Sequence, residues 1–102
     1  MTGPDETYAA ILGATSQIEW QALERHFAAG NLLSVSRELD LVEVAGAFTR
    51  DDTGQVRRWM EDKQLGPASD EEAADWSRRN PDTLWAVVIR PWVLVQERAA
   101  TH

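Results

Sequence analysis

The segment WAVVIRPWVLV, residues 85–95, is the most apolar stretch of the sequence, and Arg90 and Pro91 interrupt it at its centre. In an extended chain, successive side chains point to opposite faces, and both faces of this segment are mostly apolar. Strands buried on both faces have this composition, whereas a half-exposed strand alternates apolar and polar residues. Proline donates no ladder hydrogen bond and is confined to edges, strand starts and bulges. We therefore expect an extended segment over residues 84–97 that is split near Pro91. In a continuous strand, Trp92 would lie on the same face as Leu84.

The length of the chain predicts a single domain over residues 1–102, because one hydrophobic core commonly serves about 100–150 residues. Hydrophobic residues make up 43% and charged residues 26% of the sequence, as in ordinary soluble globular proteins. Arg90 interrupts the only run that approaches a membrane span. The N-terminus shows neither the basic start nor the apolar core of a signal peptide. These features predict a cytoplasmic protein with no membrane partner.

Several kinds of chemistry are excluded or disfavoured by composition. The absence of cysteine excludes disulfides, thiolate metal sites and a cysteine nucleophile. No two histidines have metal-ligand spacing, the glycines are isolated, and no serine lies in a Gly-x-Ser-x-Gly frame. The net charge of −7 works against nucleic acid, which is bound through clustered Lys and Arg. We expect no catalytic residues, no metal and no cofactor.

Helix starts are indicated where Ser or Asp is followed three residues later by Glu or Gln, because the two side chains satisfy free backbone N–H groups. The pairs are Ser16 with Glu19, Asp40 with Glu43, Asp52 with Gln55, and Ser69 with Glu72. Apolar residues at spacings of three and four follow each pair, as in amphipathic helices. An earlier helix is expected at about residues 5–14. The acidic clusters at 51–52 and 70–72 fall at these starts, where negative charge favours the helix dipole.

Short segments at 32–36 and 64–68 are the other predicted strands. From residue 19 onward the order of elements resembles a winged-helix domain, with Arg50–Asp51–Asp52 as the turn between two helices. We therefore predict an α+β fold in which four to five helices pack on a small two- to three-stranded antiparallel sheet. The helix expected after Ser69 departs from the winged-helix pattern, and the analogy says little about function.

The predicted function is a non-catalytic protein-interaction module that self-associates or binds another protein. The few helices of a small domain are expected to cover one face of a sheet more readily than two. Part of the strand after Pro91 is therefore expected at a subunit contact or partner groove, with Arg90, Trp92 and Gln96 as the interaction surface. Tryptophan and arginine are enriched in such contacts. An alternative is that Trp92 closes the core beside Arg90.

Two other functions stay open. In a winged-helix-like nucleic-acid-binding or regulatory protein, the helix after Asp52 would place Gln55, Arg57 and Arg58 toward a groove, although the acidity of the chain opposes this. An enzyme would need to bring His26 together with Asp51 or Asp52 in a pocket. His26 has no neighbour in sequence that would orient it as a base.

Four segments of the chain are similar to a known family. They are IEWQALERHFAAGNLLSV (residues 18–35), LDLVEVAGAF (39–48), DD (51–52) and LWAVVIRPWVLVQER (84–98). They resemble small bacterial proteins grouped as domain of unknown function 2288, and the resemblance covers residues 18–98. It implies a bacterial, cytoplasmic protein without an assigned activity. No catalytic residue is carried over from the family.

Overall fold

The computed structural model describes residues 15–98, so the helix expected at residues 5–14 lies outside the described part of the chain. The elements in chain order are β1 (Ser16–Gln17), α2 (Trp20–Ala28), β2 (Leu32–Val35), α3 (Leu41–Thr49), α4 (Thr53–Glu61), β3 (Leu65–Pro67), α5 (Asp70–Arg79), β4 (Leu84–Ile89) and β5 (Trp92–Glu97). The fold is therefore α+β, as predicted, with more strands than the sequence indicated.

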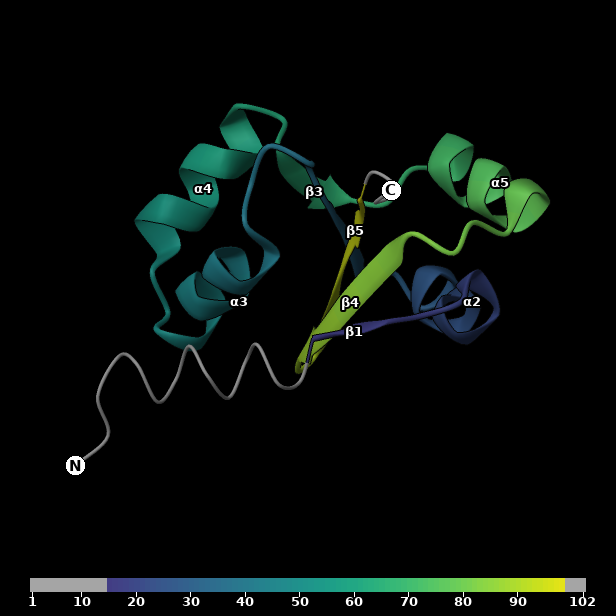
Figure 1. Cartoon of the computed structure of the whole chain (residues 1–102). Coiled ribbons are helices and arrows are strands. Elements are labelled where there is room, and N and C mark those ends of the chain that lie inside the picture. Colours follow the sequence, from purple (N-terminus) through teal and green to yellow (C-terminus); the bar gives the residue numbers. More distant parts are fainter. Residues whose placement is uncertain (1–14, 99–102) are drawn as a thin grey trace.

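The strands form one mixed sheet in the order β1-β4-β5-β2-β3. β5 lies at its centre, antiparallel to β4 and parallel to β2, and Figure 1 shows it between the two halves of the molecule. The prediction of two to three antiparallel strands is wrong, and the winged-helix order is matched only in part, since the elements follow one another as predicted but the pairing of the strands differs. One reason is that β1 has only two exposed residues and carries no apolar pattern. The other is the parallel pairing of β2 with β5, which joins segments about 60 residues apart in sequence.

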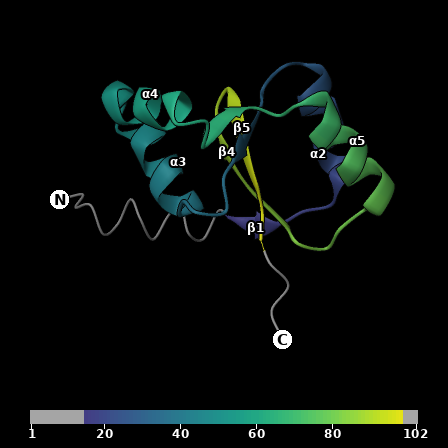
Figure 2. The ribbon, with the colours of Figure 1, turned by 90° about the horizontal axis from the view of Figure 1, so that it is seen from above.

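Two pairs of helices enclose the sheet. Figure 2 shows α3 and α4 on one side and α2 and α5 on the other. Buried sheet residues on the α3–α4 face are Leu33, Val35, Leu65, Val87 and Leu94. Buried sheet residues on the α2–α5 face are Leu32, Leu84, Ala86, Val93 and Val95. The expectation that the helices would cover only one face is wrong, because four helices of nine or ten residues supply an apolar face to each side.

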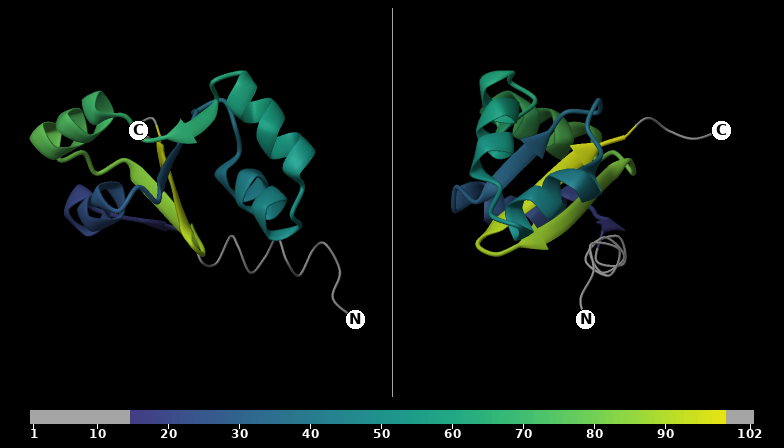
Figure 3. Two further views of the ribbon diagram at one scale, coloured as in Figure 1. Left: turned by 180° about the vertical axis from the view of Figure 1, so that it is seen from behind. Right: turned by 90° about the vertical axis from the view of Figure 1, so that its left-hand side faces the viewer.

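The apolar segment is split at Pro91, as predicted, into a hairpin. Ile89 and Trp92 pair across it, Arg90 and Pro91 form the connection, and the peptide bond between these two residues is cis. The turn reverses the chain, so Trp92 and Leu94 lie on the same face as Val87 and Ile89. The face expected for Trp92 from a continuous strand is therefore wrong. Figure 3 shows α3 lying across β4 and β5 on this face.

Three of the four predicted helix starts are confirmed. Ser69 and Glu72 form a complete capping box, with bonds of 3.0 and 3.1 Å. The carboxylate of Asp40 accepts from the backbone N–H of Val42, and that of Asp52 accepts from Gln55. The fourth is wrong. Ser16 lies in β1, and α2 begins after Glu19, which makes no side-chain cap.

Candidate functional site: the groove beside Trp92

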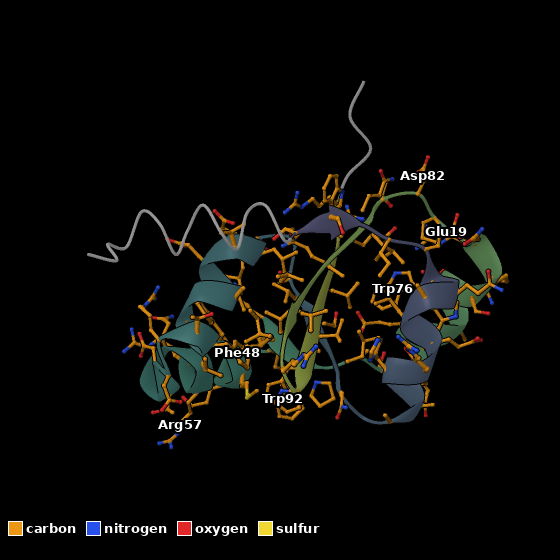
Figure 4. The ribbon with its side chains drawn as sticks, turned by 90° about the horizontal axis from the view of Figure 1, so that it is seen from below. Glu19, Phe48, Arg57, Trp76, Asp82 and Trp92 are labelled. Atoms are coloured by element: carbon orange, nitrogen blue, oxygen red, sulfur yellow. The ribbon has the colours of Figure 1, made fainter. Side chains whose placement is uncertain are left out.

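Trp92 lies at an open groove of about 350 Å³ between the α3–α4 corner and the β4–β5 hairpin, which we call the hairpin groove. The residues that line it are Ala47, Phe48, Asp51, Asp52, Thr53, Val56, Arg57, Met60 and Trp92. Phe48, Val56 and Trp92 are partly buried, whereas Met60 is 42% exposed. Figure 4 shows Phe48, Arg57 and Trp92 on the same side of the sheet. The groove can therefore receive an apolar side chain.

Charged residues surround this apolar floor. Asp51 and Asp52 lie at the rim, and Asp52 uses one carboxylate oxygen to cap α4. Asp51 takes a positive φ of 59° in the turn between the helices. Arg90 is exposed at the hairpin tip, and within residues 15–98 neither Arg90 nor Asp51 forms an ion pair. Arg57 also lines the groove and forms no ion pair within residues 15–98, so the groove and the neighbouring hairpin tip together offer both signs of charge.

Gln96 lies in the interior, which corrects its expected place on an interaction surface. Gln96 is 3% exposed, and its side-chain amide donates to the carbonyl oxygens of Ser36 and Leu39, both at 2.7 Å. Its own carbonyl accepts from Arg98 at 3.1 Å. Buried polar groups need such partners, so Gln96 fixes the loop that follows β2. Arg90 and Trp92 are the members of the predicted surface that remain accessible.

The residues of the nucleic-acid alternative lie on α4 but do not share one face. Arg57 and Arg58 are exposed, whereas Gln55 is partly buried. Consecutive helical residues are rotated by about 100°, so Arg57, which lines the hairpin groove, and Arg58 point in different directions. Glu61 and Asp62 follow at the end of the helix. The predicted helix-turn-helix corner is present between α3 and α4.

His26 and the two aspartates do not form a site. His26 belongs to α2 on one side of the sheet, while Asp51 and Asp52 lie at the α3–α4 corner on the other. The enzyme that would combine these residues is therefore excluded. Among residues 15–98, no three His, Cys, Asp or Glu side chains are arranged to hold a metal ion.

Sequence reasoning missed a polar cluster that joins α5 to the end of β5. Arg79 donates to both carboxylate oxygens of Asp75, at 2.8 and 2.6 Å, and to Glu97 at 3.0 and 3.1 Å. Burial raises the pKa of Glu97, but hydrogen bonds from Trp76 and Arg79 outweigh it and hold that pKa below its ordinary value. Asp75 and Arg79 have the spacing of a helical ion pair, which was readable from the sequence. Nothing in the sequence indicated Glu97.

The fold and groove together define a small α+β domain with a mixed sheet between two helix pairs. The chain belongs to the family described as a protein of unknown function, DUF2288, which it matches over residues 6–97. This confirms the resemblance seen in the sequence.

The chain is also similar to a solved structure, the NMR solution structure of PA1075 from Pseudomonas aeruginosa. The two are 47% identical, with a TM-score of 0.80 over 94% of this chain and 90% of that one. No functionally curated protein matches the chain. None of the helices in residues 15–98 is long and apolar enough to cross a membrane.

Proposed function

We propose that this protein is a non-catalytic interaction module that self-associates as a two-fold dimer through the hairpin groove. The observation that carries the proposal is the groove itself, in which partly buried Trp92 and exposed Met60 form an apolar floor that no other described element covers. Apolar patches framed by charged residues are typical of protein contacts.

A second copy fits the groove because the charges around it are self-complementary. Arg90 at the hairpin tip is cationic and Asp51 at the groove rim is anionic, and neither is paired within the described chain. In a two-fold interface each residue pair occurs twice. The hairpin tip of one copy at the rim of the other would form two Arg90–Asp51 pairs and cover both Trp92 side chains.

Sedimentation velocity tests the proposal. The wild type should sediment as a concentration-dependent dimer, and Trp92→Glu should sediment as a monomer because it places a charge on the apolar floor. Val88→Glu is the matched control: it makes a similar change on the same hairpin at a residue that is 58% exposed and lies on the opposite face. The control should still dimerise. Circular dichroism establishes that both variants fold.

A charge exchange keeps the proposal testable if Trp92→Glu does not fold. Arg90→Asp and Asp51→Lys should each weaken the dimer, and an equimolar mixture of the two should recover it as a heterodimer in which both pairs again join opposite charges, one in the native sense and one reversed. Lysine is tolerated at such a φ, since Lys63 adopts 61° in this chain. A wild type that stays monomeric at high concentration, or an Arg90→Asp variant that dimerises like the wild type, would overturn the proposal.

Nucleic-acid binding is a second candidate, supported by the helix-turn-helix corner and by exposed, unpaired Arg57 and Arg58 in the described chain. Electrophoretic mobility shift with duplex DNA at low salt is the test, since phosphate contacts are strongest there. Retardation that is lost in the Arg57→Gln/Arg58→Gln double variant would support it. Unretarded DNA at high protein concentration would remove it.

A further inference from the structure

A second, larger cleft of about 610 Å³ lies beside the carboxyl ends of the parallel strands β2 and β5. Figure 1 shows this end of the sheet, where β3 lies between the end of α4 and α5. The lining residues that matter for binding come from three parts of the chain. They are Ser34 and Arg37 on and after β2, Lys63 and Gly66 before and within β3, and Glu72 and Asp75 on α5. In open sheets, ligands bind at the carboxyl ends of the strands.

Two of the acids at this cleft are already paired with a cation. Asp75 is held by Arg79, and so is Glu97, which also accepts from the indole of Trp76. Glu72 is different, because its carboxylate accepts only neutral donors, the hydroxyl of Ser34 at 2.7 Å and a backbone N–H of the capping box. Within residues 15–98 no cation compensates its charge.

Two cations at the same cleft also lack a counter-charge. Arg37 donates through Nε to the backbone carbonyl of Glu97 at 3.2 Å and forms no ion pair in the described chain, and neither does Lys63. The backbone N–H of Ser36 donates to the carbonyl of Gln64 at 2.8 Å. Arg37 follows Ser36 and Lys63 precedes Gln64, so the backbones of the two cations are close. Glu38 lies beside them, since its carboxylate accepts from the side-chain amide of Gln64 at 3.2 Å, but it does not line the cleft. The charged residues that line this end of the cleft are therefore cations, and we call it the cationic end.

The two ends are separated by a short distance. The carboxylate of Glu72 accepts from Ser34. Arg37 and Lys63 adjoin the bonded residues Ser36 and Gln64, and Ser36 is two residues beyond Ser34 in the chain. These two backbone levels are about 6.6 Å apart at 3.3 Å per residue. Gly66 lies opposite Ser34, and a Cβ built on it would have no atom within 4 Å, so the space there is open.

We propose that this cleft binds a small zwitterion. Arg37 and Lys63 hold its phosphate or carboxylate group, and Glu72 holds its ammonium group. Arginine offers the planar donor geometry that both anions accept. A ligand carrying only negative charge is disfavoured by the net charge of −7, so the ammonium group is needed for tight binding. β5 begins at the hairpin groove and ends at this cleft, and Met60 is the lining residue that the two have in common.

NMR titration of the labelled full chain tests the inference with probes that separate the two charges. O-Phosphoethanolamine and γ-aminobutyrate carry an ammonium with a phosphate or a carboxylate, and identify which anion is preferred. Inorganic phosphate is only negative and ethanolamine only positive, so each of these single-charge probes carries one sign of charge. At least one zwitterion should shift the amides of Ser34 and Gly66 and bind about tenfold more tightly than either single-charge probe, a difference of about 1.4 kcal/mol.

Four variants test the parts of the site. Arg37→Gln and Lys63→Asn should weaken the zwitterion and phosphate alike, by about tenfold. Glu72→Gln keeps the capping box, which accepts glutamine at this position, and should remove the advantage of the zwitterion while leaving phosphate binding unchanged. Gly66→Val should block both by filling the open space. Absence of binding by both zwitterions, or equal weak binding to the wild type and every variant, would overturn the inference.

Discussion

Trp76 and Glu97 are joined by a hydrogen bond of 3.0 Å from the indole N–H to a carboxylate oxygen, which ties α5 to the end of the central strand. Arg79 and Thr83 donate to the same carboxylate, so Glu97 accepts from three side chains. The carboxylate is the common partner of the helix and of the segment that leads into β4. Removing its charge should therefore loosen the packing of α5 on the sheet.

Replacing Glu97 by Gln should lower the free energy of unfolding by about 1 kcal/mol at neutral pH. The pKa of Glu97 is lowered in the folded state because its hydrogen bonds outweigh the effect of burial. A glutamate whose pKa is lowered in the folded state stabilises the fold fully at pH values above its ordinary pKa of about 4.3. This stabilisation is lost as pH falls through the pKa of the folded state. Urea unfolding from pH 7 to pH 3 should show the two proteins converging at acid pH. A constant difference across that range would contradict this account.

Gln96→Met should destabilise the fold by roughly 1–3 kcal/mol, because the carbonyl oxygen of Leu39 loses its side-chain donor, whereas that of Ser36 keeps the backbone N–H of Leu39. An unsatisfied buried polar group costs about 1–3 kcal/mol. Gln21→Met, at an exposed position of α2, is the control and should change stability by less than about 0.5 kcal/mol. Equal unfolding midpoints for the two variants would show that the Gln96 amide contributes nothing.

Because α3 covers β5, Leu94→Ala should lower the free energy of unfolding by about 3 kcal/mol, since Leu94 is fully buried and the truncation leaves a cavity. Chemical denaturation measures this change. Val88→Ala, on the neighbouring strand, should cost less than about 1 kcal/mol because more than half of that residue is exposed. Measurements at low protein concentration avoid any contribution from self-association. A small effect at Leu94 would mean that α3 does not cover this face.

Ser69→Ala should cost about 1 kcal/mol, because it removes the hydroxyl that caps α5. Ser16→Ala should be close to neutral, although the same sequence pattern surrounds both serines, since Ser16 lies in a strand and caps no helix. Thermal unfolding of the two variants compares the two sites directly. A larger loss at Ser16 than at Ser69 would contradict the observed start of α2.

The helices of the described chain were largely predictable because their signals are local. A cap such as Asp40 or Ser69 and an apolar repeat of three and four residues suffice to place a helix. Sheet topology depends instead on pairing between distant residues. Leu33 lies beside Leu94 in the parallel pair, and no feature of either segment names the other as its partner.

The proposed sites were predictable only in part. Arg90 and Trp92 stood out because Arg90 and Pro91 interrupt an apolar segment and a large aromatic side chain follows them directly. Gln96 was misplaced because a polar residue in a strand favours exposure, whereas here backbone carbonyls from a distant loop satisfy it. The cationic end formed by Arg37 and Lys63 depends on the β2–β3 pairing, which local sequence does not specify.

The central position of β5 also determines the order in which this domain can be assembled. Among the described strands, β4 with β1 and β2 with β3 form two pairs that meet only through β5. A ribosome delivers β5 after all the others. Until residue 97 has left the exit tunnel, each pair keeps an open edge and unprotected apolar surface, which favours aggregation and chaperone binding. Completion of the sheet is therefore expected to wait until β5 has emerged.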